Sequence, residues 1–179
     1  MCLAAKDLKL EIAEKDMIVY KVVSLRSKNK ILSCIRETPY KLGTTYTLSE
    51  PLQIIAQPYN DINIWDTKAF RDNHIMYNSI VDTVHKGFHS ATTMERLRAY
   101  KTIMKCKIPK GSTIVRDNSG LIVSDVLRTL GIYVQIKLVP KPYRIDTKIS
   151  ILHMGETYRY ISANVFRKLT KMQTYLKVR

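Results

Sequence analysis

The chain has 179 residues, with 30 Lys and Arg against 15 Asp and Glu, and its formal net charge at pH 7 is +15. That length fits one domain, or one domain with a small appendage, and a composition of 45% apolar and 25% charged residues excludes a wholly disordered chain. No apolar run approaches the roughly 20 residues that a membrane-crossing helix needs, so the sequence predicts no membrane partner.

The N-terminal half predicts short strands followed by an irregular segment. Residues 3–16 mix helix-forming residues with both charges, which indicates a short helix or a tethered lead. Residues 17–23 form a β-branched, apolar run that is typical of a buried strand, and residues 31–35 and 44–48 predict two further strands. Residues 51–83 are broken by prolines and polar pairs, and they predict a long loop or insertion of the kind that often carries function.

The clearest local pattern follows Gly87. Thr92 and Glu95 have the spacing of a capping box, which predicts a helix over residues 93–100. Strands separated by turns at Pro109-Lys110-Gly111 and Asp117-Asn118-Ser119-Gly120 are predicted over residues 102–108, 112–115, 121–123 and 132–139.

The C-terminal segment predicts a strand over residues 157–161 and then a last helix capped by Ser162. The apolar stripe of this helix is predicted to consist of Val165, Leu169, Met172 and Leu176. Together the elements predict an α+β fold, in which a twisted, mostly antiparallel sheet carries few short helices and a basic C-terminal helical extension. The expected organisation is a core domain over residues 1–139, with the irregular insertion at 51–83, and a basic extension over residues 140–179.

The cysteines and histidines predict neither a disulfide framework nor a metal site. Cys2, Cys34 and Cys106 are odd in number and have no short repeated spacing. His85 and His89 are four residues apart, but Gly87 lies between them and indicates a turn or a strand start rather than a zinc-binding helix. No secretory signal is visible, so a reducing compartment is expected. No cofactor is predicted.

Positive charge gathers toward the C-terminus, where residues 137–179 carry ten Lys and Arg against two acidic residues. Lys and Arg neutralise phosphate backbones, and release of counterions makes that attraction strong. The candidate nucleic-acid-binding residues are Arg144, Arg159, Arg167, Lys168, Lys171, Lys177 and Arg179. A solvated helix face, a polyanion such as nucleic acid, and an acidic protein surface are the three interpretations of this segment.

No catalytic set is assembled by the sequence. His89 and Ser90 follow Gly87, but neighbouring residues on a strand point to opposite faces and cannot form a nucleophile–base pair. A structural turn and a binding site are both open for this segment. Phosphate-loop and dinucleotide-binding glycine motifs are absent, and carboxylates are not paired in sequence. An enzyme is therefore not favoured, and no catalytic residue is predicted.

Five short motifs follow one another in a fixed order, at residues 18–22, 40–46, 87–90, 104–112 and 122–125. With the Met1-Cys2-Leu3 opening, this order resembles a family of small proteins without an established activity that occur in tailed phages and mobile elements of gut Bacteroidetes-type bacteria. The resemblance spans about the first 130 residues. It implies a phage accessory or virion-associated protein that acts in the host cytoplasm or the virion, with other virion proteins as partners.

The same order is similar, more distantly, to ADP-ribosyltransferase-like folds. In those folds a first strand carries an aromatic or basic residue, a second carries a Phe-x-Ser-type motif, and a third carries a catalytic glutamate. The resemblance places a ligand-binding set at Tyr20, Lys21, Phe88, His89, Ser90, Ser124 and Asp125. Because the third position holds Ser124 and Asp125 instead of a glutamate, it implies nucleotide binding more than transferase chemistry.

Two functions therefore stand as expectations. The first is a non-enzymatic protein that binds a polyanionic partner, either nucleic acid or an acidic protein surface. The alternative is an ADP-ribosyltransferase-like nucleotide-binding protein or enzyme. Such a protein would be a host-defence antagonist if it sequesters a signal nucleotide or blocks a host protein. The oligomeric state is left open.

Overall fold

The computed structural model describes residues 3–26, 30–34, 38–58, 80–97, 102–135, 150–153 and 156–171. The elements in chain order are β1 (Leu3–Ala5), β2 (Glu11–Ile12), β3 (Met17–Arg26), β4 (Lys30–Ser33), β5 (Pro39–Tyr40), β6 (Thr45–Thr47), β7 (Ile55–Pro58), β8 (Ile80–Val84), β9 (Phe88–Ala91), the 3-10 helix η3 (Glu95–Leu97), β10 (Thr102–Ile108), β11 (Thr113–Arg116), β12 (Leu121–Ser124), β13 (Val126–Gln135), β14 (Ser150–His153), β15 (Glu156–Ser162) and α2 (Ala163–Lys171). Among these residues, no helix is long and apolar enough to cross a membrane.

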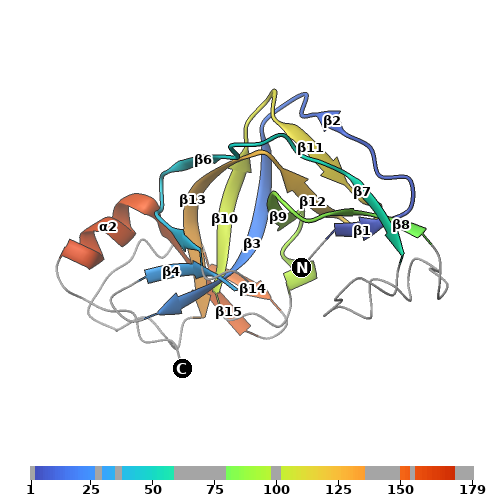
Figure 1. Ribbon diagram of the computed structural model, residues 1–179. Coiled ribbons are helices and arrows are strands. Elements are labelled where there is room, and N and C mark those ends of the chain that lie inside the picture. The colour runs from blue at the N-terminus through green and yellow to red at the C-terminus, as the bar shows by residue number, and fades with distance from the viewer. Residues whose placement is uncertain are drawn as a thin grey trace.

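One large sheet forms the body of the fold, with β3, β10 and β13 side by side at its centre (Figure 1). The hydrogen-bonded order is β14-β15-β13-β10-β3-β9-β12-β11-β2; β4 pairs with β3 and β5, and β6 pairs with β13. A second sheet contains β1, β8 and β7. Every strand pair in the described ranges is antiparallel, so the prediction of a mostly antiparallel sheet is confirmed.

Buried side chains form two clusters, one on each face of the large sheet, because successive strand residues point to opposite faces. On β3, Val19 and Val23 belong to the first cluster, whereas Tyr20 and Val22 pack against the second. The second cluster also contains Leu3 of β1, so the small sheet covers part of that face. Figure 1 shows β1, β7 and β8 together at one end of the large sheet.

The described residues show neither the helix that was one of two interpretations of residues 3–16 nor an α-helix at the start of the segment predicted over residues 93–100. Residues 3–16 contain the short strands β1 and β2 instead of a helix, since β1 pairs with β8 and β2 pairs with β11. Thr92 N and Thr92 Oγ1 both donate to the Gly120 carbonyl oxygen, at 2.9 and 3.2 Å. Only the single turn η3 follows, and residues 98–100 lie outside the described ranges.

Long-range pairing also changes the interpretation of the predicted insertion. Its two ends are strands, β7 and β8, which pair with each other from Ile55↔Thr83 to Pro58↔Ile80. Residues 59–79 between them lie outside the described ranges.

The end of the chain joins the same sheet, because β15 pairs with β13 over five residue pairs. Val165 N lies 3.5 Å from Ser162 Oγ, the position expected of a capping hydroxyl. Phe166, which the predicted stripe omitted, is buried in the first cluster, and Val165 packs against that cluster. The other three stripe residues, Leu169, Met172 and Leu176, have side chains outside the described set.

Candidate functional site

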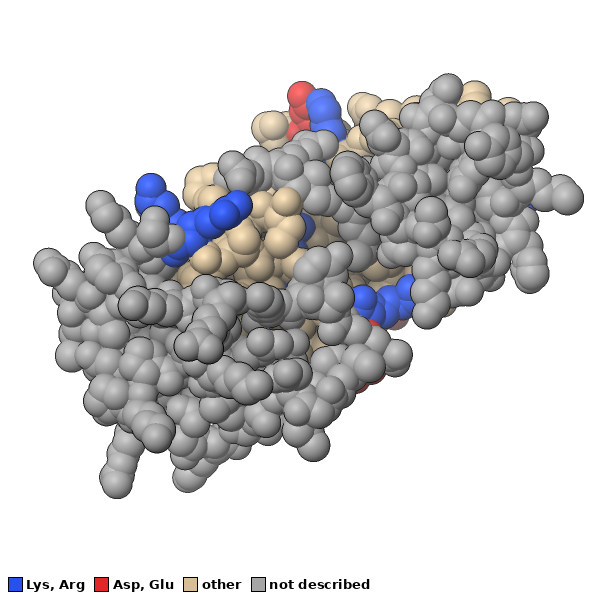
Figure 2. All heavy atoms as spheres, turned by 90° about the horizontal axis from the view of Figure 1, so that it is seen from below, with Lys and Arg blue, Asp and Glu red and all other residues tan. Residues whose placement is uncertain are grey.

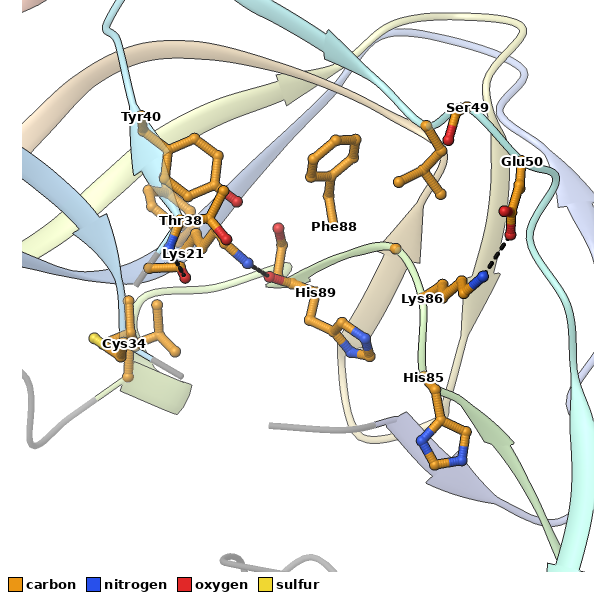
Figure 3. A pocket seen from close by; sticks show the side chains of 17 residues that line it. Lys21, Cys34, Thr38, Tyr40, Ser49, Glu50, His85, Lys86, Phe88 and His89 are labelled. Atoms are coloured by element: carbon orange, nitrogen blue, oxygen red, sulfur yellow. Dashed lines mark hydrogen bonds and ion pairs between the residues drawn. The ribbon is translucent and has the colours of Figure 1, made fainter. Parts of the chain in front are cut away.

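A cavity of about 500 Å³ opens between the central strands and the segments that precede β7 and β9. Its walls come from β3, β4, β5 and β9, from residues 48–50, and from residues 85–87 (Figure 3). The lining residues are Tyr20, Lys21, Val22, Ser33, Cys34, Thr38, Tyr40, Leu48, Ser49, Glu50, His85, Lys86, Gly87, Phe88, His89, Ser90 and Leu97. Segments far apart in sequence therefore share one pocket.

Lys21 is the polar residue at the inner end of this pocket. It lies on β3 between Val19 and Val23, two buried positions of the first cluster, so its side chain points to the same apolar face. Its Nζ donates a hydrogen bond of 2.7 Å to the backbone carbonyl oxygen of His89, which Figure 3 marks with a dashed line. Among the described residues, the ion pairs with Asp or Glu involve other cations, and none involves Lys21.

Burial lowers the pKa of Lys21 from 10.5 to about 8, and the nearby thiols of Cys106 and Cys34 act in the opposite direction. An ammonium group in an apolar environment loses hydration, so its charged form is disfavoured unless an anion compensates it. The described part of the chain supplies Lys21 with a carbonyl dipole and no carboxylate. Within the described part of the chain, the pocket therefore holds a cation at neutral pH that no carboxylate compensates.

Ser90 also lines the pocket, and its hydroxyl has no hydrogen-bond partner among the described residues. It faces Ile122 across the β9–β12 pair, which places its side chain on the side of the first cluster. The residue is 5% exposed, and its Oγ has no hydrogen-bond partner among the described residues. Buried hydroxyl groups are almost always hydrogen-bonded in folded proteins. The Oγ of Ser90 therefore keeps unused hydrogen-bonding capacity within the described part of the chain.

We expect the substitution Ser90→Ala to raise stability by about 1 kcal/mol, because it removes a buried hydroxyl that gains nothing from the fold. Ser124→Ala is the matched control, since Ser124 is equally enclosed but its Oγ donates to the Val126 carbonyl oxygen at 2.9 Å. That control should lower stability by about 1 kcal/mol. Urea unfolding of both variants measures the difference, and a loss of stability in Ser90→Ala would show that its hydroxyl is already paired.

Aromatic rings form the apolar wall of the pocket. Tyr40 is 8% exposed, and its burial raises the pKa of its hydroxyl to about 12, so the group stays protonated. Its ring packs edge-on against Tyr46 with centroids 5.2 Å apart, and Tyr46 contacts Phe88 at 6.4 Å. In Figure 3 the rings of Tyr40 and Phe88 stand on the same side of the cavity as the amine of Lys21. A flat or apolar ligand body fits against such a wall.

The outer part of the pocket is polar. Lys86 forms an ion pair with Glu50 at 2.5 Å, and both side chains are well exposed. His85 Nε2 lies 3.1 Å from Thr83 Oγ1 and 3.3 Å from Gln57 Oε1. Because the Thr83 hydroxyl donates to the Ile55 carbonyl oxygen, the proton between Thr83 and His85 belongs to Nε2. These contacts hold the His85 ring at the pocket edge.

The predicted ligand-binding set divides into two parts. The structure brings Tyr20, Lys21, Phe88, His89 and Ser90 together in the pocket wall. The strands that carry the set are neighbours, because β9 pairs with both β3 and β12.

Ser124 and Asp125 are not among the residues that line the pocket. The hydroxyl of Ser124 donates to the carbonyl oxygen of Val126, and Asp125 Oδ1 accepts the backbone N–H of Thr113 at 3.0 Å. Both groups hold the β11–β12–β13 connections. The third position of the predicted set is therefore structural in this fold.

Sequence reasoning missed the pocket residues contributed by the segments after β3. Cys34, Tyr40, Glu50 and Lys86 line the pocket but were not predicted as site residues. The signal for a pocket residue that the sequence offers is a charged residue in the middle of an apolar strand, and it identifies Lys21 but none of these four residues.

Most of the seven basic residues predicted to bind nucleic acid have side chains that the structure does not describe. Arg167 and Lys168 of α2 are exposed, and Arg167 Nη2 donates to Asn164 Oδ1 at 3.3 Å. Arg159 and Lys171 have described backbones only, and the remaining members, Arg144, Lys177 and Arg179, lie outside the described ranges. On the face drawn in Figure 2, basic side chains of the described residues stand in separate groups, some with an acidic side chain beside them.

No group of three or more His, Cys, Asp or Glu side chains in the described ranges is arranged to hold a metal ion. In comparisons with known proteins, the chain matches no family model, no curated protein and no solved structure. The geometry of the pocket and of α2 is therefore the basis for the function proposed below.

Proposed function

We propose that this protein binds a small molecule with an anionic group and a flat or apolar body in the pocket around Lys21. The observation that carries the proposal is the ammonium of Lys21, which is half-buried, lines the cavity and has no carboxylate partner among the described residues. An anion supplies the missing counter-charge.

The rest of the pocket supports the same class of ligand. A cavity of about 500 Å³ is within the range of small-molecule sites. Tyr40, Phe88 and Leu48 provide apolar contact area next to the polar end. A nucleotide belongs to this class, since its phosphate is anionic and its base is flat, and the predicted nucleotide-binding function is thus one form of the proposal.

Calorimetry with benzoate, phenyl phosphate and AMP tests the proposal, with benzamide as the neutral counterpart of benzoate. We expect saturable binding of at least one anion and a tenfold or larger preference for benzoate over benzamide. Lys21→Met should abolish the preference, whereas Lys86→Met should leave most of it, because Lys86 is already paired with Glu50. The absence of saturable heat with all three anions would contradict the proposal.

The affinity should also depend on pH in one direction. Lys21 is mostly charged at pH 7 and mostly neutral at pH 9, since its pKa is about 8. Affinity for an anion should therefore fall about tenfold between pH 7 and pH 9. An affinity that is constant over this range would remove Lys21 from the binding site.

A second candidate function, the binding of a polyanionic partner, is favoured by α2. This nine-residue helix carries three basic residues and no acidic one. Arg167 and Lys168 are exposed, and among the described residues neither forms an ion pair with a carboxylate. A basic helical extension that contacts nucleic acid or an acidic protein, within a virus particle in the phage-like case, accounts for this surface.

We expect duplex DNA to bind with an affinity that falls steeply with salt, because Lys and Arg release counterions from phosphates. The double substitution Arg167→Gln and Lys168→Gln should reduce the slope of log affinity against log salt by about 2. The matched control removes two exposed lysines near the N-terminus, Lys9→Gln and Lys15→Gln, and should change the slope less. Fluorescence anisotropy between 50 and 200 mM salt measures this slope, and binding that is indifferent to salt would eliminate this candidate.

A further inference from the structure

We propose that Lys21 Nζ acts as a nucleophile toward small aldehydes or ketones and forms a reversible imine with them inside the pocket. The inference rests on the proposed function, since it uses the same cavity, but it adds a covalent activity and a substrate class. The geometry that points to it is a half-buried amine on the apolar face of β3, held by the carbonyl oxygen of His89, in a cavity large enough for a small molecule.

The surroundings of Lys21 favour a reactive amine over a structural cation. A structural lysine in a protein core is normally paired with a carboxylate, which keeps it protonated. Here Nζ donates to the carbonyl oxygen of His89, and a neutral amine N–H can make that hydrogen bond as an ammonium does. Burial favours the neutral form, which carries the lone pair that attacks a carbonyl carbon.

The hydrogen bond to His89 also orients the amine. One N–H is directed at the carbonyl oxygen 2.7 Å away, so the position of Nζ is fixed from the backbone of β9. The lone pair and the second N–H of the neutral amine remain for the cavity. A nucleophile held in one orientation loses less entropy on reaction than a flexible surface lysine does.

The reaction balances without an oxidant or reductant. The Nζ lone pair attacks the carbonyl carbon, the C–N bond forms, and the carbonyl π electrons move to oxygen. A proton passes from nitrogen to that oxygen and gives a carbinolamine. The nitrogen lone pair then expels the hydroxyl group, which leaves as water after it gains a proton, and loss of the second N–H proton gives the neutral imine. One carbonyl compound and one amine therefore give one imine and one water.

Benzaldehyde tests the inference, because it presents a carbonyl on the same ring that benzoate presents as an anion. The full-length protein is treated with benzaldehyde and sodium cyanoborohydride at pH 8, which converts an imine into a stable benzylamine by hydride transfer. Peptide mass spectrometry then locates the benzyl group. We expect Lys21 to be labelled about tenfold faster than the other lysines, because a larger fraction of its amine is neutral at pH 8 and His89 orients it.

Two variants separate this activity from anion binding. Lys21→Arg keeps the positive charge but forms no imine, so it should retain benzoate binding and lose the site-specific label. Lys105→Arg is the matched control, since Lys105 is a half-buried lysine of the neighbouring strand β10, and it should leave labelling at Lys21 unchanged. Circular dichroism and thermal unfolding establish that each variant is folded.

The outcomes distinguish the two proposals. Preferential labelling of Lys21 that benzoate slows by competition supports both. Benzoate binding together with labelling of Lys21 no faster than that of surface lysines overturns the imine and leaves the anion site standing. Neither binding nor preferential labelling overturns both.

Discussion

Replacing Lys21 by Met should make the protein more stable while it removes ligand binding. Met has a similar length and no charge, and it fits among the apolar residues that surround this position on β3. The substitution removes the desolvation cost of an ammonium that has no carboxylate partner among the described residues. It also removes one hydrogen bond to His89, worth about 1 kcal/mol, so the net gain is smaller than the full charge penalty.

The size of the gain follows from the pKa. A shift from 10.5 in the unfolded chain to about 8 in the fold corresponds to about 3 kcal/mol at neutral pH. After the lost hydrogen bond, we expect a net gain of about 2 kcal/mol, or a rise in Tm of roughly 4–8 °C.

The stability that Lys21→Met gains over the wild-type protein should decrease as the pH rises. Below pH 8 Lys21 is charged in both states, and the whole penalty is present. Between pH 8 and 10.5 the folded protein releases the proton that the unfolded chain still holds, so the wild-type protein gains stability relative to the variant. The advantage of Lys21→Met over wild type should therefore shrink as pH rises from 8 to 10.5. A destabilised variant at pH 7 would show that Lys21 has a counter-charge in the fold.

Replacing Gly87 by Ala should destabilise the protein and distort the pocket. Gly87 has φ +138°, which L side chains rarely adopt, and it precedes β9 in the pocket wall. A Cβ at this position would collide with Val123 Cγ1 and lie 2.9 Å from Leu52 Cδ2, and both partners are buried in the second cluster. Backbone strain and overpacking together should cost about 3–4 kcal/mol. Urea unfolding measures the loss, and benzoate titration measures the effect on the pocket.

Gly111→Ala separates the two causes. Gly111 also has a positive φ, +85°, but a Cβ added there would have no neighbouring atom within 4 Å. Only backbone strain acts at this position, so the expected loss of stability is about 1 kcal/mol. Equal losses in the two variants would show that the collision with Val123 and Leu52 is relieved by movement, and that Gly87 is required only for its φ.

The central strands were predictable because their pattern is local. The strand predicted over residues 102–108 coincides with β10, and those predicted at 17–23 and 121–123 lie within β3 and β12. Apolar and polar residues alternate or run together in these segments, and the turn at Asp117 is closed by its own carboxylate, which accepts the N–H groups of Ser119 and Leu121. Such signals need no knowledge of the partner strand.

The predictions failed where a distant partner decides the structure. β1 and β2 are short, and they are strands only because β8 and β11 lie beside them. Thr92 has the sequence of a helix cap, but its N–H and its hydroxyl both donate to the carbonyl oxygen of Gly120, 28 residues away. Tertiary pairing overrode local propensity at both places.

The candidate site, too, was predictable where its motifs are local and not where distant segments meet. Two motifs of the predicted set, Tyr20-Lys21 and Phe88-His89-Ser90, meet in the pocket because β3 and β9 are neighbours. The third motif does not line it, since the side chains of Ser124 and Asp125 are used in strand connections. The sequence contains no signal for Cys34 or Glu50, because their place depends on how the chain returns after β3 and before β7.

The hydrogen bond from Lys21 to His89 joins residues 68 positions apart, and the pocket forms only when that distance in the chain has been closed. Chains dominated by such non-local pairings fold slowly, typically in milliseconds to seconds. Recovery of ligand binding during refolding should therefore be a late event that follows closure of the central sheet. A bound anion would then stabilise the protein chiefly by lowering its unfolding rate. The lifetime of the native state would therefore lengthen as the concentration of ligand rises.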